Sequence, residues 1–284
     1  QFEITVNAIN DAPTLGDNSD VSTNEDETIE IALLASDVDG DEITFSIEED
    51  VNSGTLTLDG AVVTYVPTEN SNGVDSFSFT ATDGNLTTDE FTINITVTSV
   101  NDSPVLDVLD EVSFDEGGSD ALSLSASDVD SEDLTYSISD GTDITATLDV
   151  DSVTFTTTDE NYNGSENFTV SVTDGELTDS QVITVTINAV NDDPIAGDGI
   201  TGTTPEGASV SIALSGTDVD GDVLTYSTID DAAHGTVVVS GSYATYTPND
   251  YFNGEDTFTF TVSDGLLSDD AIVTVTITEV NDPP

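Results

Sequence analysis

Acidic and amide side chains recur in short motifs that keep a constant spacing along the 284-residue chain. The tetrapeptide Asn-Asp-x-Pro begins at Asn10, Asn101, Asn191 and Asn281, at offsets of 91, 90 and 90 residues. An Asp-Val-Asp sequence, an Asp-Gly pair and a single Glu recur in the same register. Carboxylate and amide oxygens are the ligands that hard divalent cations prefer, so these residues could perform cation binding.

The strongest candidates for metal ligands are the members of these motifs: Asn10, Asp11, Glu25, Asp37, Asp39, Asp83, Asn101, Asp102, Glu116, Asp128, Asp130, Asp174, Asn191, Asp192, Asp218, Asp220 and Asp264. Weaker candidates are further acidic residues in the same register: Asp41, Asp75, Glu132, Glu166, Glu206, Asp222, Asp256 and Asp282. The Asp-Val-Asp-Gly-Asp loop does not fit an EF-hand, because its glycine falls at the fourth position rather than the sixth.

The motif spacing divides the chain into three complete repeats between two partial ones. We expect the complete repeats at residues 10–100, 101–190 and 191–280. Residues 1–9 match the last strand of a repeat, and residues 281–284 match the start of the next linker. The sequence is therefore expected to be part of a longer tandem array.

Apolar residues alternate with polar ones within each repeat, which is the period of a β-strand. A short strand is expected after Pro13, and turn signals such as Asn-Gly and Asp-Gly separate the later strands. The alternating runs of the first repeat cover residues 29–33, 43–47, 56–58, 63–65, 77–81 and 91–97. About seven strands in ~90 residues predict an all-β fold, in which three antiparallel seven-stranded immunoglobulin-like β-sandwiches follow one another.

Alternating strand directions would bring three acidic motifs of each repeat to one pole of its sandwich. The Asn-Asp linker precedes the first strand, Asp-Val-Asp follows the second, and Asp-Gly follows the sixth. Glu25 precedes the second strand, and a strand of about eight residues spans roughly 26 Å, so Glu25 can meet only the motifs of the next repeat. Carboxylates this close repel one another unless a dication binds them. Calcium fits better than magnesium, because the ligands come from several segments.

The combined motifs resemble bacterial cadherin-like and immunoglobulin-like tandem repeats of giant secreted, RTX-type adhesins, and the resemblance covers the whole chain. It implies cadherin-like sandwiches in a monomeric rod, acting as an extracellular spacer of a bacterial cell surface, with Ca²⁺ bound where adjacent repeats meet. It also implies ligand roles for Glu25, Glu116, the linker Asn-Asp, the Asp-Val-Asp pair and the Asp before Gly. The cadherin Asp-Arg-Glu motif is absent, since the chain has no Arg, and Asp75, Glu166 and Asp256 are the candidates to replace it.

The composition excludes several classes of partner. The chain has 59 acidic residues, no Lys or Arg, and a formal net charge of −59. Nucleic-acid binding is not expected, because no cationic side chain can hold phosphate groups, and an anionic membrane surface would repel the chain. No apolar run approaches the ~18 residues of a transmembrane helix, so direct membrane insertion is not expected either.

An enzymatic function is not expected. His234 is the single histidine and is interpreted as a turn residue, so a Ser–His–Asp set is implausible. Paired carboxylates could cleave glycosides only in a cleft, which single sandwiches seldom supply. The alternative function is a calcium-dependent module for polysaccharide binding or homophilic cell adhesion. Tyr162, Tyr251 and Phe252 could stack on sugars, although local packing also explains them.

Overall fold

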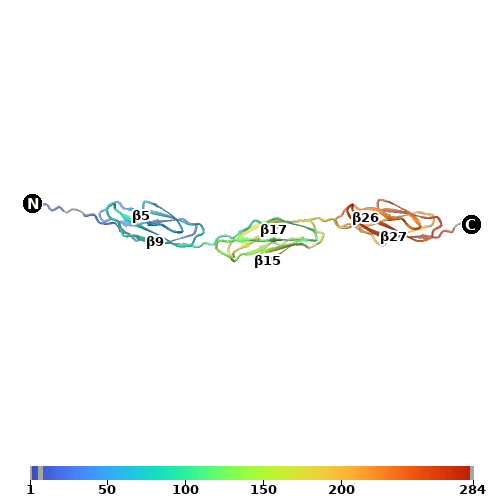
Figure 1. The fold of residues 1–284 in the computed structure, drawn as a ribbon, viewed down its shortest axis with the longest axis horizontal. Coiled ribbons are helices and arrows are strands. Elements are labelled where there is room, and N and C mark those ends of the chain that lie inside the picture. The colour runs from blue at the N-terminus through green and yellow to red at the C-terminus, as the bar shows by residue number, and fades with distance from the viewer. Residues whose placement is uncertain (1, 6–8, 282–284) are drawn as a thin grey trace. The chain divides into compact units, whose positions relative to one another are not determined.

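Every regular element of the described chain is a β-strand (Figure 1). The computed structural model describes residues 2–5 and 9–281, and all structural statements below refer to these residues. The alternating pattern of the sequence appears directly as alternating burial, for example along β9 (Phe91–Thr98), where every second side chain is buried. The prediction of an all-β tandem array of three sandwiches is confirmed.

The strands divide evenly among the three sandwiches. The first contains β1 (Thr14–Leu15), β2 (Val21–Asn24), β3 (Ile29–Ala32), β4 (Ala35–Ser36), β5 (Thr44–Glu49), β6 (Gly54–Asp59), β7 (Val62–Pro67), β8 (Gly73–Thr82) and β9 (Phe91–Thr98). The second contains β10 (Val105–Leu106), β11 (Val112–Asp115), β12 (Ser119–Ser123), β13 (Ala126–Ser127), β14 (Thr135–Ile138), β15 (Ile144–Asp149), β16 (Ser152–Thr157), β17 (Gly164–Thr173) and β18 (Thr178–Asn188). The third contains β19 (Ile195–Ala196), β20 (Thr201–Pro205), β21 (Val210–Ala213), β22 (Gly216–Thr217), β23 (Thr225–Asp230), β24 (Gly235–Ser240), β25 (Tyr243–Pro248), β26 (Gly254–Ser263) and β27 (Ser268–Thr278).

Two of the seven predicted strands are split in every sandwich. In the first sandwich, the strand expected after Pro13 forms β1 and β2, and the run expected at 29–33 forms β3, followed by β4. Because the strand is split, its two parts pair in different sheets. β1 pairs with β4, whereas β2 pairs with β9 in the four-stranded sheet. Gly16 lies at this crossover, where a Cβ atom would come within 2.8 Å of the Leu34 Cβ.

Each sandwich consists of a four-stranded sheet, a three-stranded sheet and a short two-stranded pair. The strand orders of the first sandwich are β2-β9-β8-β5 and β3-β7-β6. Most neighbours are antiparallel, but β2 and β9 run parallel, with Val21 opposite Ile95. The same parallel pair recurs as β11–β18 and β20–β27. This follows from the strand count, because the first and last of seven alternating strands point the same way.

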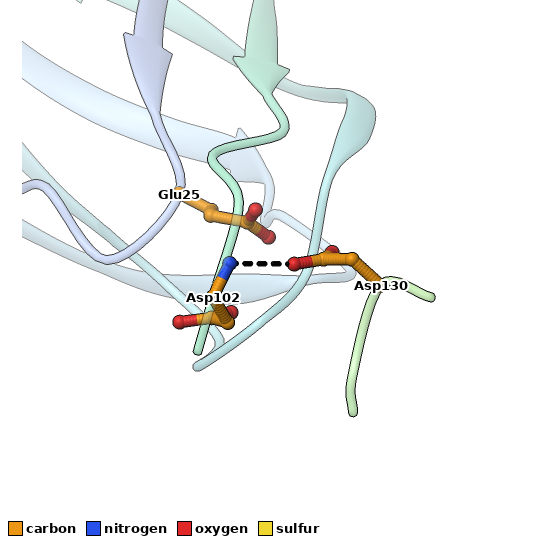
Figure 2. Close-up of side chains that lie close together, drawn as sticks. All are labelled: Glu25, Asp102 and Asp130. Carbon is orange, nitrogen blue, oxygen red and sulfur yellow. Dashed lines mark hydrogen bonds between the residues drawn. The ribbon is translucent and has the colours of Figure 1, made fainter. Parts of the chain in front are cut away.

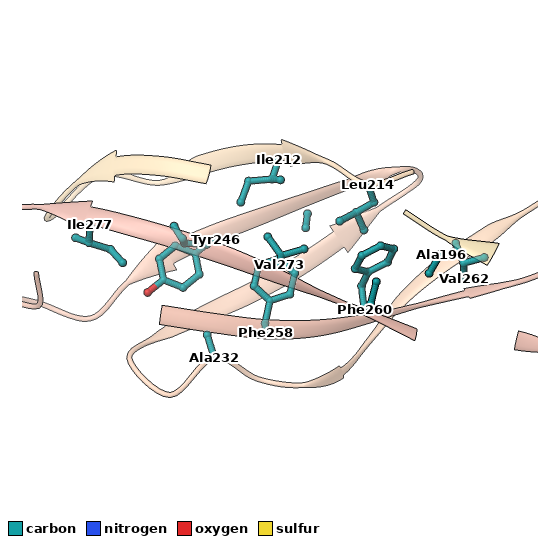
Figure 3. Packing of buried hydrophobic residues seen from close by; sticks show 13 residues of the cluster. Ala196, Ile212, Leu214, Ala232, Tyr246, Phe258, Phe260, Val262, Val273 and Ile277 are labelled. Atoms are coloured by element: carbon teal, nitrogen blue, oxygen red, sulfur yellow. The ribbon is translucent and has the colours of Figure 1, made fainter. Parts of the chain in front are cut away.

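The apolar face of each sheet is buried in the interior of its own sandwich. Figure 3 shows the third core, where Tyr246, Phe258, Phe260 and Val273 pack among the strands. Tyr246, Phe260 and Val273 are fully buried. Burying a side chain of this size stabilises the fold by about 1.5–3 kcal/mol. These cores are what hold the polar loops at the ends of each sandwich in place.

The chain groups into two compact units, and the division passes through the second sandwich. The first unit takes in the described residues of Gln1–Val108, Leu124–Ser137 and Ser171–Gln181. The second unit takes in those of Leu109–Ser123, Ile138–Val170 and Val182–Pro284. The acidic loops that follow β13 and β17 of the second sandwich therefore fall in the first unit.

The strand predicted within residues 1–9 does not form among the described residues 2–5 and 9. Phe2 and Ile4 are exposed. Val6 lies outside the described residues. That these residues belong to a preceding repeat stays a prediction.

Candidate metal centres

Three carboxylates from three separate segments converge at the end of the first sandwich (Figure 2). Glu25, Asp102 and Asp130 each offer an oxygen, and these oxygens lie within 4.8 Å of one another. The sequence predicted this meeting, since it placed Glu25 opposite the linker and the Asp-Val-Asp loop of the following repeat. We call this group the first cluster.

Hydrogen bonds from the backbone fix the position of Glu25. Its amide donates to the Thr98 carbonyl at 2.9 Å, and its Oε1 accepts the Val100 amide at 2.6 Å. The side chain is only 3 % exposed, which is unusual for a glutamate without a cationic partner. The parallel pairing of β2 with β9 carries Glu25 to the linker, because both strands end at this pole.

The linker and the loop after β13 hold the rest of the first cluster together. The Asp102 amide donates to Oδ2 of Asp130 at 2.8 Å, which is the dashed bond in Figure 2. Oδ1 of Asp128 accepts the Asp130 and Ser131 amides, both at 2.8 Å. One oxygen of Asp128 and one of Asp130 are thus occupied by backbone donors.

Several buried carboxylate oxygens have no hydrogen-bond partner. Within the described residues they are Glu25 Oε2, Asp37 Oδ2, Asp102 Oδ2, Asp128 Oδ2, Asp192 Oδ2 and Asp218 Oδ2. All belong to the residues that the sequence put forward as ligands. An ionised carboxylate accepts several hydrogen bonds, and burying one of its oxygens without a donor is costly. A hard cation bound to these oxygens removes that cost, so the residues fit calcium.

Mutual repulsion accompanies this crowding. Burial raises the pKa of the Asp102 carboxyl above its ordinary value, and the charges of Asp130, Asp26, Glu25 and Asp128 raise it further. A raised carboxyl pKa means that the surroundings disfavour its charged form. A bound dication would attract each of these carboxylates and would therefore favour their charged forms.

A second cluster repeats this arrangement one repeat later. Glu116, Asp192 and Asp220 bring their oxygens within 4.8 Å of one another. The Asp192 amide donates to Asp220 at 2.8 Å, and Oε1 of Glu116 accepts the Val190 amide. Burial and the charges of Asp220, Glu116, Asp218 and Glu160 raise the pKa of Asp192.

The second cluster differs from the first at its glutamate. Glu116 is only half-buried, and its Oε2 accepts the side-chain amide of Asn163 at 3.3 Å. Asp218, Asp220 and Asp222 form a further group of close oxygens around the same loop. The two clusters therefore have equivalent residues, but their glutamates differ in burial and in hydrogen bonding.

The side-chain NH₂ groups of the predicted linker asparagines bond to the Asp-Gly loops. Asn101 and Asn191 each donate to the following aspartate's carbonyl and to the aspartate of the Asp-Gly loop, Asp174 and Asp264, at 2.7 Å. Hydrogen bonds from the Leu177 amide, the Asn101 side chain and the Glu176 amide lower the pKa of Asp174. The loop aspartates are thus held ionised beside the clusters.

The first linker makes the same hydrogen bonds to the loops of its own sandwich. Asn10 donates to Asp83, and the Asp11 amide donates to Asp39. Asp37, Asp39 and Asp41 bring oxygens within 4.8 Å of one another. At the other end, Glu206 accepts the Val280 amide at 2.6 Å, and Asp282 lies outside the described residues.

The remaining weaker candidates lie away from these clusters. Oδ2 of Asp75 accepts the Ser53 amide and the Tyr65 hydroxyl, and Asp256 makes the matching bonds with His234 and Tyr246. Glu166 accepts the Thr142 and Asp143 amides. Their oxygens are occupied in holding the loop after β5, β14 or β23, which supports a structural role. Glu132 is exposed and belongs to none of the acidic groups found in the described residues.

Two acidic residues that act on the clusters were not singled out from the sequence. The charge of Asp26 helps to raise the pKa of Asp102, and the charge of Glu160 helps to raise the pKa of Asp192. Glu160 could have been found, because the equivalent positions of the other two repeats are also acidic, Glu69 and Asp250. Asp26 could not, because Gly stands at its register position in the other two repeats.

Histidine and aromatic residues pack locally at the end of the third sandwich. The rings of His234 and Phe252 stack with centroids 4.1 Å apart and planes inclined by 11°. The His234 amide donates to Asp256 at 2.8 Å. These contacts support the interpretation of His234 as a residue of a turn.

Comparison with known proteins agrees with this architecture. The model of the family described as "Bacterial Ig domain" matches residues 10–96, 101–186 and 191–278. A structure titled "Protocadherin Gamma B2 extracellular cadherin domains 1-5" is similar at a TM-score of 0.65 and 16% identity, covering 96% of this chain and 61% of that one. The chain thus spans about three fifths of that structure's length. "Protocadherin gammaB7 EC3-6 cis-dimer structure" is similar at 0.60 and 18% identity, covering 94% and 74%. At these identities the likeness shows the fold alone.

A search of curated proteins gave no significant match. Among the described residues, no helix is long and apolar enough to cross a membrane.

Proposed function

Because the chain belongs to the bacterial immunoglobulin-like domain family, we propose that it is a spacer of a large bacterial surface adhesin. In this proposal the repeats 10–100, 101–190 and 191–280 form a monomeric extracellular rod. Calcium bound by the two clusters stiffens it, and the partners of each repeat are its neighbours in the same chain.

The unpartnered, buried oxygens of the clusters are the observation that carries this proposal. The three residues of the first cluster and the neighbouring Asp128 would hold one cation, which supplies positive charge to oxygens that have no donor. The three residues of the second cluster and the neighbouring Asp218 would hold another. Asn101 and Asn191 orient the linker rather than supplying the charge.

The mechanism is electrostatic. Without a cation, Glu25 and the Asp102–Asp130 pair repel one another. The 101–104 linker then becomes more mobile. With calcium, the same carboxylates become ligands of one ion and restrain the linker. Calcium that binds only the folded state adds stability, by about 2.7 kcal/mol per site at a hundred times the dissociation constant.

Calorimetric titration of chelator-treated protein with CaCl₂ tests the proposal. We expect two tight sites, assigned to the two clusters, and weaker binding at the Asp37–Asp41 loop. The Asp128→Ala/Asp130→Ala double variant should remove one tight site and leave the other. The proposal is wrong if the wild-type protein takes up no calcium.

A glycan array probed in the presence of calcium tests the alternative. Strong and selective binding of one polysaccharide by these repeats would contradict a spacer function and favour a ligand-binding module.

A further inference from the structure

The glutamates of the two clusters differ in what their second oxygen contacts. In both, Oε1 accepts the backbone amide of the residue that precedes the linker asparagine. Oε2 of Glu25 is buried without any partner, in a side chain that is only 3 % exposed. Oε2 of Glu116 instead accepts the side-chain amide of Asn163 at 3.3 Å, and Glu116 is half-buried. The first glutamate therefore lacks a donor that the second one has.

This donor lies in a loop that is longer in the second sandwich than in the others. Residues 158–163 connect β16 to β17, whereas residues 68–72 and 249–253 make the same connection in the first and third sandwiches. Asn72 holds the register of Asn163, directly before the glycine that begins the next strand. It is not bonded to Oε2 of Glu25, since that oxygen has no partner. The amide contact therefore accompanies the longer loop and is absent from the first cluster.

The difference bears on how strongly each cluster attracts a cation. A buried carboxylate oxygen without a donor makes the cation-free state unfavourable, because the lost hydration of that oxygen is not compensated. A cation at the first cluster supplies the missing partner of Glu25 without displacing a donor from that oxygen. At the second cluster, a cation that takes Oε2 of Glu116 must displace the Asn163 amide. The free energy of that hydrogen bond is then subtracted from the binding of the cation.

The hydrogen bond sets the size of this effect. A bond to a charged group is stronger than one between neutral groups, but 3.3 Å is long for an N–H···O bond, and Asn163 is exposed. We therefore expect the lower end of the range for charged groups, which corresponds to about a three- to tenfold change in affinity.

An opposing effect comes from the loop after β22. Asp222 lies in one group of close oxygens with Asp218 and Asp220, whereas its counterpart Glu132 belongs to none of the groups found in the described residues. Asp222 is exposed, so its attraction for a cation is screened by salt. The exchange at Glu116 is a direct contact and persists at physiological ionic strength. The contact therefore decides the order of affinity under those conditions.

We propose that Asn163 competes with a divalent cation for Glu116, so that the first cluster fills at a lower calcium concentration than the second. This inference rests on the proposed function and adds the order in which its two sites are occupied. The 101–104 linker is then restrained first, and the 191–194 linker only when calcium rises further. The repeats respond to calcium in two steps.

Asn163→Ala removes the competing donor. Calorimetric titration with CaCl₂ at about 150 mM salt should show the weaker of the two tight sites strengthened about three- to tenfold. The tighter site should be unchanged, which also shows that the variant is folded. Asn72→Ala is the matched control, because it removes an asparagine at the same register position, where the cluster glutamate has an unpartnered oxygen. It should leave both sites unchanged.

Two further variants assign the sites and locate the effect. Asp128→Ala/Asp130→Ala should lose the tighter site, which places that site at the first cluster. In a Glu116→Ala background, Asn163→Ala should have no effect on calcium binding, because the oxygen for which the amide competes is gone.

The inference is overturned if Asn163→Ala leaves the second site unchanged, or weakens it as the loss of a ligand would. It is also overturned if the Asp128→Ala/Asp130→Ala variant keeps the tighter site. Absence of calcium binding by the wild-type protein would instead overturn the proposed function itself.

Discussion

The side-chain amide of Asn101 donates a 2.7 Å hydrogen bond to Oδ2 of Asp174, which lies 73 residues further along the chain. The same bond joins Asn10 to Asp83 and Asn191 to Asp264, each at 2.7 Å. The linker is therefore tied to the loop between the last two strands wherever the Asn-Asp-x-Pro motif is followed by a sandwich.

Replacing Asn101 with aspartate should destabilise the cation-free protein by about 1–3 kcal/mol. The change removes a donor and sets a second anion against Asp174. Denaturant unfolding in chelator measures the loss. Asn167→Asp is the control, because its oxygen accepts the Thr184 hydroxyl and aspartate can do the same. Equal stability of Asn101→Asp and the control would contradict this role of the linker.

Glu25→Gln should change the stability of the first cluster in opposite directions with and without calcium. Glutamine keeps the oxygen that accepts the Val100 amide and removes a charge that repels Asp102, so the cation-free protein should melt at a higher temperature than wild type. With calcium it should melt lower, because one ligand charge is lost. Thermal unfolding in chelator and in excess calcium distinguishes the two signs. A shift in the same direction under both conditions would show that Glu25 does not face a cation.

Asp75 should make the first sandwich sensitive to acid. Burial raises its pKa, but hydrogen bonds from the Asn52, Ser53 and Ser76 amides and the Tyr65 hydroxyl lower it overall. The folded-state pKa therefore lies below the unfolded one. The stabilisation is fully present above the ordinary range near pH 4 and is lost as the pH falls through the folded value.

Asp75→Asn should accordingly lower stability at neutral pH by about 1–3 kcal/mol and flatten its acid dependence. Urea unfolding at several pH values in chelator provides the measurement, with exposed Asp59→Asn as the control. An unchanged acid dependence in Asp75→Asn would contradict the assignment.

Much of the fold could be predicted from the sequence, because its signals are local. The alternation along residues 91–97 predicts a strand with one buried face, and β9 has that pattern. The splitting of the first strand into β1 and β2 could not be predicted, since it depends on which sheet edge each short segment finds. The parallel partner of β2 is likewise set by tertiary packing rather than by its four residues.

The candidate site shows the same contrast. The convergence of Glu25 with Asp102 and Asp130 follows from strand directions and repeat order, both readable from the spacing of the motifs. The hydrogen bonds from loop amides to Asp75 could not be predicted, because the donors lie in the loop after β5 and have no recognisable sequence motif. Asp26 could not be singled out, because Gly stands at its register position in the other two repeats.

Small-angle scattering of the wild-type protein in calcium and in chelator, beside the Asp128→Ala/Asp130→Ala variant, tests most directly whether a cation fixes neighbouring repeats. We predict that calcium narrows the distribution of interatomic distances of the wild-type protein towards a single extended form. The variant should retain a broad distribution, because only its second cluster can be filled. Identical scattering of the wild-type protein with and without calcium, under conditions where titration shows calcium bound, would contradict the account.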